Sequence, residues 1–191
     1  LCTVLRPEEH AERPDSAGRP VLFTEMRVVD AEGADVAPGE LGEVVYRSPQ
    51  LCEGYWEKPE ATAEAFRDGW FHSGDLVQVD EQGYITVVDR IKDVINSGGV
   101  LIASREVEDA LFSHPAVAEA AVIGTPDEKW VEAVTAVVVL KEDVTVEALL
   151  EHARTRLAGF KVPKAVHVIE ELPKNASGKI LKRELRESVG G

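Results

Sequence analysis

The hydrophobic pattern of the chain changes near residue 90, and this change constrains the fold more than any other feature. Between about residues 20 and 88, apolar and polar residues alternate as in half-buried strands, for example in EMRVVD and EVVYRS, and turn clusters separate these runs. After residue 90, helical and strand patterns follow each other. We therefore expect a mixed α+β chain, with a β-rich part over 1–89 and an α/β part over 90–191 in which helices flank a central sheet.

The β-rich part is expected to begin with a loop and to end with a pair of strands. Residues 1 to about 20 are polar and contain Pro7, Pro14 and Pro20, so we expect a loop there. A short helix is expected to start at Pro59, because proline is tolerated at the first helical position. The segment WFHSGDLVQVDEQGYITVVDR predicts two strands joined by a turn that contains DEQG.

The α/β part contains clear helix and strand patterns. SREVEDALFSH predicts a helix with Ser104 as its N-cap, and TVEALLEHARTRL predicts a helix that presents Leu149, Leu150, Ala153 and Leu157 on one face. Strands are expected in VAEAAVIGTPD, EAVTAVVVLKE and AVHVIEEL, followed by a short helix in LKRELRES. NSGGVLI places two glycines after a polar pair, and the simplest interpretation of it is a hairpin turn.

The segment DRIKDV, at 89–94, joins the two parts and contains neither glycine nor proline. We expect it to be a short charged connector, with a hinge near 89–93. Arg90 and Lys92 are two residues apart, so an extended segment would direct both side chains to one side of the chain. Taken alone, these charges could simply be solvated, or the Arg90 guanidinium could bind a phosphate or ribose oxygen.

Charge and composition exclude several classes of function. The formal net charge of -14 would repel a nucleic acid, so no nucleic-acid partner is expected. The two cysteines lack metal-ligand spacing and the five histidines are scattered, so no metal site is expected. No apolar run approaches the length of a transmembrane segment, and no signal-peptide pattern follows Leu1. We expect a cytoplasmic piece of a longer protein; its oligomeric state is not predicted.

Three short motifs have a chemical as well as a structural interpretation. In SGD, the carboxylate of Asp75 offers two acceptor oxygens that suit a ribose diol, although a solvated turn is the simpler explanation. At Gly98 and Gly99, bare backbone would let a ligand chain pass close by. PKNASGK ends in Lys179, which could be a solvated surface lysine or a mobile cation that neutralises oxyanions. Each motif is weak by itself.

The order of five stretches is more specific than any of them alone. They are GELGEVV with EGYWEKPEAT, GWFHSGDL, DRIKDVINSGGVLIASREVE, HPAVAEAAVIGTPDEKWVEAVTAVVVL and FKVPKAVHVIEELPKNASGKILKREL. In this order they resemble the adenylate-forming enzymes, which include acyl-CoA synthetases, adenylation domains of peptide synthetases and beetle luciferases. The resemblance extends from about residue 17 to 187. It implies that 1–89 is the end of a large N-terminal domain, a β-barrel-like layer, and that 90–191 is a small mobile C-terminal domain.

The resemblance implies the chemistry of an acid–thiol ligase. Such enzymes use ATP, with Mg²⁺, to convert a carboxylic acid into an acyl-adenylate with loss of pyrophosphate. The acyl group then passes to a thiol, usually that of coenzyme A. The missing N-terminal domain of the same polypeptide is the implied partner. Because this chain contains no TSGTTG-type phosphate loop, we expect it to be inactive alone and not to bind ATP tightly.

The resemblance also implies roles for individual residues. Asp75 matches the carboxylate that holds the ribose hydroxyls of AMP, and Arg90 matches an arginine that contacts ribose or phosphate. Lys92 matches the hinge position. The pair Gly98–Gly99 matches the loop that lines the pantetheine channel, and Lys179 matches the catalytic lysine of the adenylation step. In that mechanism the small domain rotates, the lysine withdraws and the glycine loop enters, so that one cleft serves two reactions.

Several positions depart from the family pattern and leave alternatives open. Val100-Leu101 replaces the Glu-Asn of many acyl-CoA synthetases, and Ala103-Ser104 replaces Tyr-Pro, so pantetheine contacts near this loop stay open. A fatty-acid–CoA ligase is the leading hypothesis, with an adenylation domain of a peptide synthetase or an aryl-acid-activating enzyme as the alternative. A non-catalytic binding or regulatory module with the same fold is an alternative of another class. The acyl pocket is expected upstream, so the sequence does not predict chain length.

Overall fold

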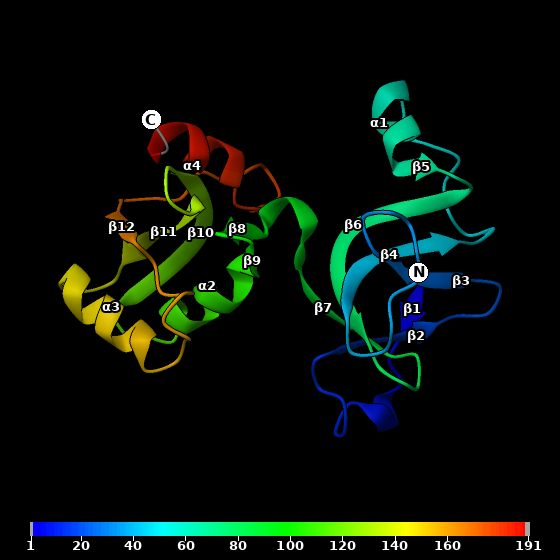
Figure 1. Cartoon of the computed structure of the whole chain (residues 1–191), viewed down its shortest axis with the longest axis horizontal. Coiled ribbons are helices and arrows are strands. Elements are labelled where there is room, and N and C mark those ends of the chain that lie inside the picture. The colour runs from blue at the N-terminus through cyan, green and yellow to red at the C-terminus, as the bar shows by residue number, and fades with distance from the viewer. Residues whose placement is uncertain (1, 190–191) are drawn as a thin grey trace. The chain divides into compact units, whose positions relative to one another are not determined.

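The computed structural model describes residues 2–189, which form two compact units (Figure 1). The first unit ends at Lys92 and the second begins at Asp93. The mixed α+β fold class expected from the sequence is confirmed, since one unit is built mainly from antiparallel strands and the other from a sheet with helices on it. The interpretation of the first unit as the end of a larger domain stays a prediction.

The first unit is a seven-stranded antiparallel sheet. Its strands follow the order β1 (Thr3–Val4), β2 (Ser16–Pro20), β7 (Ile85–Arg90), β6 (Trp70–Val79), β4 (Leu41–Arg47) and β3 (Glu25–Val29), with β5 (Phe66–Arg67) beside β6. A short 3-10 helix, η1 (Pro7–Glu9), and a helix, α1 (Pro59–Ala65), complete the unit. The predicted strands at β3, β4, β6 and β7 and the predicted helix that starts at Pro59 are all present.

A small aliphatic core supports this sheet. Its buried members come from β3, β4, β6 and β7, namely Val28, Val44, Tyr46, Val77 and Ile85. Val44 and Tyr46 lie two positions apart in β4 and so face this core together, as the period of a strand requires. The same burial raises the pKa of the Tyr46 phenol to about 12, with smaller contributions from neighbouring acidic groups.

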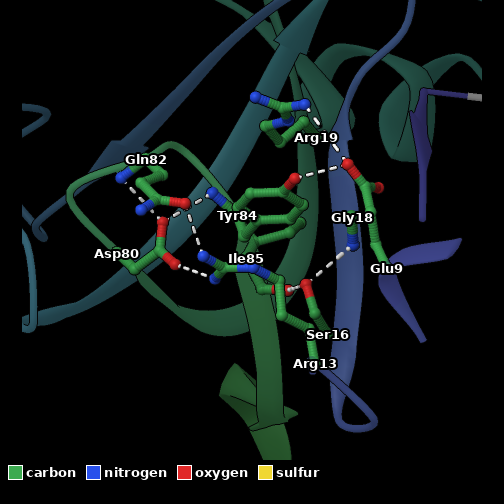
Figure 2. A network of polar contacts seen from close by, with 9 residues as sticks. All are labelled: Glu9, Arg13, Ser16, Gly18, Arg19, Asp80, Gln82, Tyr84 and Ile85. Carbon is green, nitrogen blue, oxygen red and sulfur yellow. Dashed lines mark hydrogen bonds and ion pairs between the residues drawn. The ribbon is translucent and has the colours of Figure 1, made fainter. Parts of the chain in front are cut away.

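The expectation of a loop over residues 1 to 20 is wrong, because that segment contains β1, η1 and β2. Tyr84, at the turn before β7, contacts it from two sides (Figure 2). The Tyr84 hydroxyl donates to Oε1 of Glu9 at 2.6 Å, and the guanidinium carbons of Arg13 and Arg19 lie 3.9 and 4.5 Å from the centroid of the phenol ring. These partners lie about 65 or more positions away from Tyr84 in sequence, so the local polar residues and prolines could not indicate them.

The second unit is a five-stranded sheet with helices on it. Strands β10 (Val117–Asp127), β11 (Val131–Leu140), β8 (Ile95–Ser97) and β9 (Val100–Ile102) are neighbours in that order and antiparallel, and β12 (Ala165–Val168) pairs with β11 in parallel. The helices are α2 (Ser104–Phe112), α3 (Val146–Arg154) and α4 (Lys182–Val189). All the strands and helices expected here occur, including the hairpin of β8 and β9.

Successive side chains of β10 and β11 face two separate cores. One face packs with α2 and α3, and this core includes Val122 and Val134 of the strands and Leu149 of α3, which are all fully buried. The other face packs with α4, and this second core includes Ile123 of β10 and Leu185 of α4. Figure 1 shows α4 on one side of the β10–β11 pair and α3 on the other. The helices therefore cover both faces of the sheet, as expected.

Ser104 does not have the predicted role of N-cap. Helix α2 begins at Ser104 itself, the N-cap position is Ala103, and no side chain caps the helix. The Ser104 side chain is fully buried, and its hydroxyl accepts a hydrogen bond from Nζ of Lys182 at 2.6 Å. A serine before an apolar helical pattern is a common capping signal, but here a distant lysine binds the hydroxyl instead.

The connector at 89–94 is not extended throughout. Strand β7 ends at Arg90, and Ile91–Asp93 forms a single 3-10 turn, η2. The extended backbone expected between Arg90 and Lys92 is therefore wrong, because Lys92 lies in this helical turn. Asp93 is buried and its carboxylate accepts from Nη2 of Arg186 at 3.1 Å, which ties the end of the turn to α4.

Candidate functional site

Asp75 and Arg90, both singled out in the sequence, face each other in the first unit. They occupy paired positions of the neighbouring antiparallel strands β6 and β7. Nε of Arg90 lies 2.8 Å from Oδ1 of Asp75, and both side chains remain partly exposed. The structure thus brings together a carboxylate and a guanidinium that could each bind a sugar or phosphate group.

The turn before Asp75 is fixed by hydrogen bonds to Ser73. The Ser73 hydroxyl donates to the carbonyl oxygen of Val44 at 2.7 Å and accepts from the amide of Asp75 at 3.0 Å. Nη1 of Arg90 donates to the carbonyl oxygen of Ser73 at 3.1 Å. Because both hydrogen-bonding groups of Ser73 are used, the carboxylate of Asp75 projects from a defined backbone position.

Glu43 supports the same turn, although sequence analysis assigned it no role. Its side chain is only 13% exposed. Oε1 accepts from the amide of Gly74 at 2.9 Å, Oε2 lies 2.7 Å from Nδ1 of His72, and a guanidinium nitrogen of Arg67 lies 3.4 Å away. Gly74 has a φ of +70°. Only its position in the GELGEVV stretch could have pointed to Glu43, since its partners are about thirty residues away.

A pocket of about 520 Å³ lies beside this cluster. Most of its wall is polar or charged, and the lining residues are Glu43, Tyr55, Ala61, Glu64, Ala65, Arg67, His72, Ser73, Gly74, Arg90, Ile91 and Lys92. Arg90 and Lys92 therefore share one pocket despite the helical turn between them. Asp75 is not part of the wall itself but lies next to Gly74 and pairs with Arg90. The pocket suits a polar, anionic small molecule.

Gly98 and Gly99 form the tip of the β8–β9 hairpin, as the simplest interpretation of NSGGVLI predicted. Their φ angles are +63° and +87°, a pair of left-handed residues typical of a two-residue hairpin turn. The amide of Gly98 donates to the carbonyl oxygen of Trp130 at 2.6 Å, and the amide of Gly99 donates to Oδ1 of Asn96 at 3.0 Å. The tip exposes bare backbone.

Lys179 is exposed near the end of a short loop that precedes α4. Lys174 and Ile180 form an isolated antiparallel bridge at the base of this loop. Oδ1 of Asn175 accepts from the amide of Lys179 at 2.9 Å. Within residues 2–189, the ammonium group of Lys179 makes no ion pair or hydrogen bond, whereas the ammonium of Lys174 lies 2.6 Å from Glu119.

The six residues singled out for chemistry therefore fall into three places. Asp75, Arg90 and Lys92 belong to the first unit, where the first two are in contact. The pair Gly98–Gly99 and Lys179 lie on separate loops of the second unit. Among the described residues, no helix is long and apolar enough to cross a membrane, and no three ligand-type side chains gather as a metal site.

Two family models match the chain. The model for the AMP-binding enzyme C-terminal domain matches residues 106–179, which include the Lys179 loop. The model for the AMP-binding enzyme matches residues 1–56, at the start of the first unit. Both descriptions agree with the resemblance found from the five ordered stretches, and that resemblance is confirmed.

Similar proteins include coenzyme A ligases with different acids in their names. A feruloyl-CoA synthase of Amycolatopsis is 51% identical over 94% of this chain and 37% of its own length. The long-chain-fatty-acid–CoA ligase FadD13 of Mycobacterium tuberculosis is 44% identical over 97% of this chain and 37% of its own length. The chain thus spans less than two-fifths of the length of these relatives.

A solved structure has the same fold over the whole chain. It is the o-succinylbenzoate CoA synthetase MenE of Bacillus subtilis in complex with its acyl-adenylate intermediate. It is 37% identical, with a TM-score of 0.91 over 100% of this chain and 39% of the solved chain. The same synthetase has been solved with ATP and a magnesium ion and with AMP.

Proposed function

Because the chain belongs to the family of adenylate-forming, AMP-binding enzymes, we propose that it is the C-terminal portion of an ATP-dependent acid–thiol ligase. The ligase would activate a carboxylic acid as its acyl-adenylate and transfer the acyl group to coenzyme A. ATP, AMP and coenzyme A would be its substrates and products, with Mg²⁺ accompanying ATP. Residues 1–89 would complete the large domain, the missing N-terminal part would supply the rest of the cleft, and the protein would work in the cytoplasm.

Asp75 and Arg90 would bind the nucleotide in the first unit. Arg90 contacts Oδ1 of Asp75, so Oδ2 is the oxygen directed to accept hydrogen bonds from ribose hydroxyls. The guanidinium of Arg90 has further N–H groups for a ribose or phosphate oxygen, and it lines the polar pocket. Lys92 would be the hinge, since the boundary between the two compact units follows it directly.

Lys179 would serve the adenylation step. The carboxylate of the acid and the α-phosphate of ATP repel each other, and an ammonium between them lowers the energy of the transition state. The observation that supports this role best is that Lys179 is exposed and unpaired within the described part of a chain with a net charge of -14. The Gly98–Gly99 tip would admit the pantetheine arm in the second step, since it carries no side chains.

The experiment uses the full-length protein that carries this chain, with ferulate, palmitate and 2-succinylbenzoate as acids. Formation of a free acyl-CoA, dependent on ATP and Mg²⁺, is expected for at least one acid. Lys179→Ala should lower ATP–pyrophosphate exchange by about 100-fold or more, because one preorganised charge contributes about 3 kcal/mol. It should leave acyl-CoA formation from a synthetic acyl-adenylate within about threefold. Adenylate without transfer to coenzyme A would favour the peptide-synthetase alternative, and no turnover would favour a non-catalytic module.

We propose two candidate classes of acyl substrate. A fatty acid is our first proposal, supported by the 44% identity with a long-chain ligase. An aryl acid such as a hydroxycinnamate is the second candidate, supported by the 51% identity with a feruloyl-CoA synthase. Comparing kcat/KM for palmitate and ferulate in the same assay separates the two.

A further inference from the structure

The two loops to which the proposed function assigns the two half-reactions are built around asparagine side chains. We propose that Asn175 is a positioning residue for Lys179 in adenylation, and that Asn96 is a positioning residue for the Gly98–Gly99 tip in thioester formation. The inference rests on the proposed function. Neither asparagine would touch the reacting atoms; each would fix the backbone of the group that does.

Asn175 organises its loop through a single oxygen. Oδ1 accepts hydrogen bonds from the amide of Ser177 at 3.0 Å, from the hydroxyl of Ser177 at 2.8 Å and from the amide of Lys179 at 2.9 Å. The backbone adds two more bonds, from the amide of Asn175 to the carbonyl of Lys179 and from the amide of Gly178 to the carbonyl of Asn175, both at 2.9 Å. The side chain of Asn175 is therefore bonded directly to the backbone that carries the ammonium.

The ends of this loop are held independently of Asn175. Nζ of Lys174 lies 2.6 Å from Oε2 of Glu119 in β10, and Nζ of Lys182 lies 2.6 Å from Oε1 of Glu108 in α2. Leu172, just before the loop, is fully buried in the core beneath α4. Losing the side-chain amide of Asn175 should therefore loosen the turn and leave its two ends in place. The structural change caused by Asn175→Ala should stay within the loop.

Asn96 does the same for the hairpin tip. Its Oδ1 accepts from the amide of Gly99 at 3.0 Å and so spans the two-glycine turn. The backbone amide of Asn96 donates to Oε2 of Glu132 at 2.7 Å, and a change of the Asn96 side chain would keep this hydrogen bond. The Asn96 side chain is exposed, so its truncation creates no cavity in the core.

A fixed backbone matters because the Lys179 ammonium and the Gly98–Gly99 tip can each serve its reaction only from the correct position. A displacement of about 1 Å at a reacting group can lower a rate by about 100-fold. A lysine stem is flexible, so the volume that its ammonium samples is set by where the stem starts. A glycine tip has no side chain to guide a ligand, so the path it offers depends entirely on its backbone.

The test compares Asn175→Ala and Asn96→Ala in the full-length protein, in two assays. The first is ATP–pyrophosphate exchange with the acid that gives the highest turnover among ferulate, palmitate and 2-succinylbenzoate. The second is acyl-CoA formation from the synthetic adenylate of that acid and free coenzyme A. Asn175→Ala should slow exchange by about 10- to 100-fold and change the second assay by less than about threefold. Asn96→Ala should show the opposite pattern.

Two further variants sharpen the result. Asn175→Asp keeps the acceptor oxygen and should recover most of the lost exchange activity. Asp30→Ala is a matched control, because Oδ1 of Asp30 also organises a turn, accepting from the amides of Glu32 at 3.0 Å and Ala34 at 2.8 Å in the first unit. This control should leave both assays unchanged.

The outcomes separate this inference from the function on which it rests. If Lys179→Ala slows exchange but Asn175→Ala does not, the positioning role is refuted and the proposed function stands. If Lys179→Ala leaves exchange intact, the role assigned to Lys179 fails; if the unmodified protein shows no exchange with any of the three acids, the proposed function itself fails. Equal losses in both assays for both asparagine variants would mean general unfolding and would also overturn the inference.

Discussion

The ion pair between Lys182 and Glu108 should contribute far more to the free energy of unfolding than the Arg183–Glu187 pair of the same helix, α4. Nζ of Lys182 lies 2.6 Å from Oε1 of Glu108, and the two side chains are only 15% and 22% exposed. The same ammonium donates to the buried hydroxyl of Ser104, and the same carboxylate accepts from the amide of Val122 in β10. Four groups from α2, β10 and α4 therefore depend on one another.

The magnitude follows from burial. Breaking a fully buried pair by removing one partner costs about 3–5 kcal/mol. Since this pair keeps some exposure, we expect about 2 kcal/mol for Lys182→Met, which preserves the aliphatic stem. Arg183→Met is the matched control, because the Arg183–Glu187 pair has side chains that are 89% and 64% exposed. Such a surface pair contributes only about 0.3 kcal/mol.

The assay is native-state hydrogen exchange by mass spectrometry, read on peptides from α2, β10 and α4. A loss of about 2 kcal/mol corresponds to about 30-fold faster exchange in Lys182→Met. Arg183→Met should change exchange by less than about twofold. A double-mutant cycle with Glu108→Gln should give a coupling energy above about 1 kcal/mol. Equal exchange in the two methionine variants, or a coupling energy near zero, would refute the reasoning.

Two other predictions concern pH and backbone strain. Burial, the Arg156 guanidinium and a neighbouring imidazole lower the pKa of His152 below its ordinary 6.5, so the unfolded chain binds the proton more readily. The second unit should then lose stability as the pH falls below about 6.5, and His152→Gln should flatten this dependence in urea titrations at several pH values. Gly98→Ala should destabilise the hairpin more than Gly99→Ala does, by about 1–2 kcal/mol. Both positions have a positive φ, but a Cβ at Gly98 would lie 2.8 Å from the Trp130 ring and one at Gly99 would meet nothing; equal losses on thermal unfolding would contradict this.

The parts of the fold that the sequence predicted are those marked by a local pattern of apolar residues. Strands β10 and β11 bury continuous apolar runs on both faces, and helix α3 buries helically spaced residues such as Leu149, so both patterns appear directly in the residue order. Their positions needed no knowledge of distant partners. The same holds for the Gly98–Gly99 turn, whose two positive φ angles are a local requirement.

The parts that sequence analysis missed depend on contacts between distant residues. Strand β2 exists because it pairs with β7, with Gly18 opposite Ile85, and nothing near Gly18 indicates that partner. Ser104 binds a lysine 78 positions away instead of capping its own helix. Motif order could single out Asp75, but it could not show that Glu43 holds the turn before it, since that carboxylate comes from another strand.

The distribution of charge around Lys179 links the fold to the proposed chemistry. Three other lysines of the second unit, Lys161, Lys174 and Lys182, each lie 2.6 Å from a glutamate. Those pairs link separate elements of the unit, and an ammonium already paired must give up its partner before it can bind an anion. Lys179 has no such partner among residues 2–189, and its backbone is fixed by Asn175. A cation that is held in place but left unpaired in an acidic chain keeps its full charge available for an incoming carboxylate and phosphate.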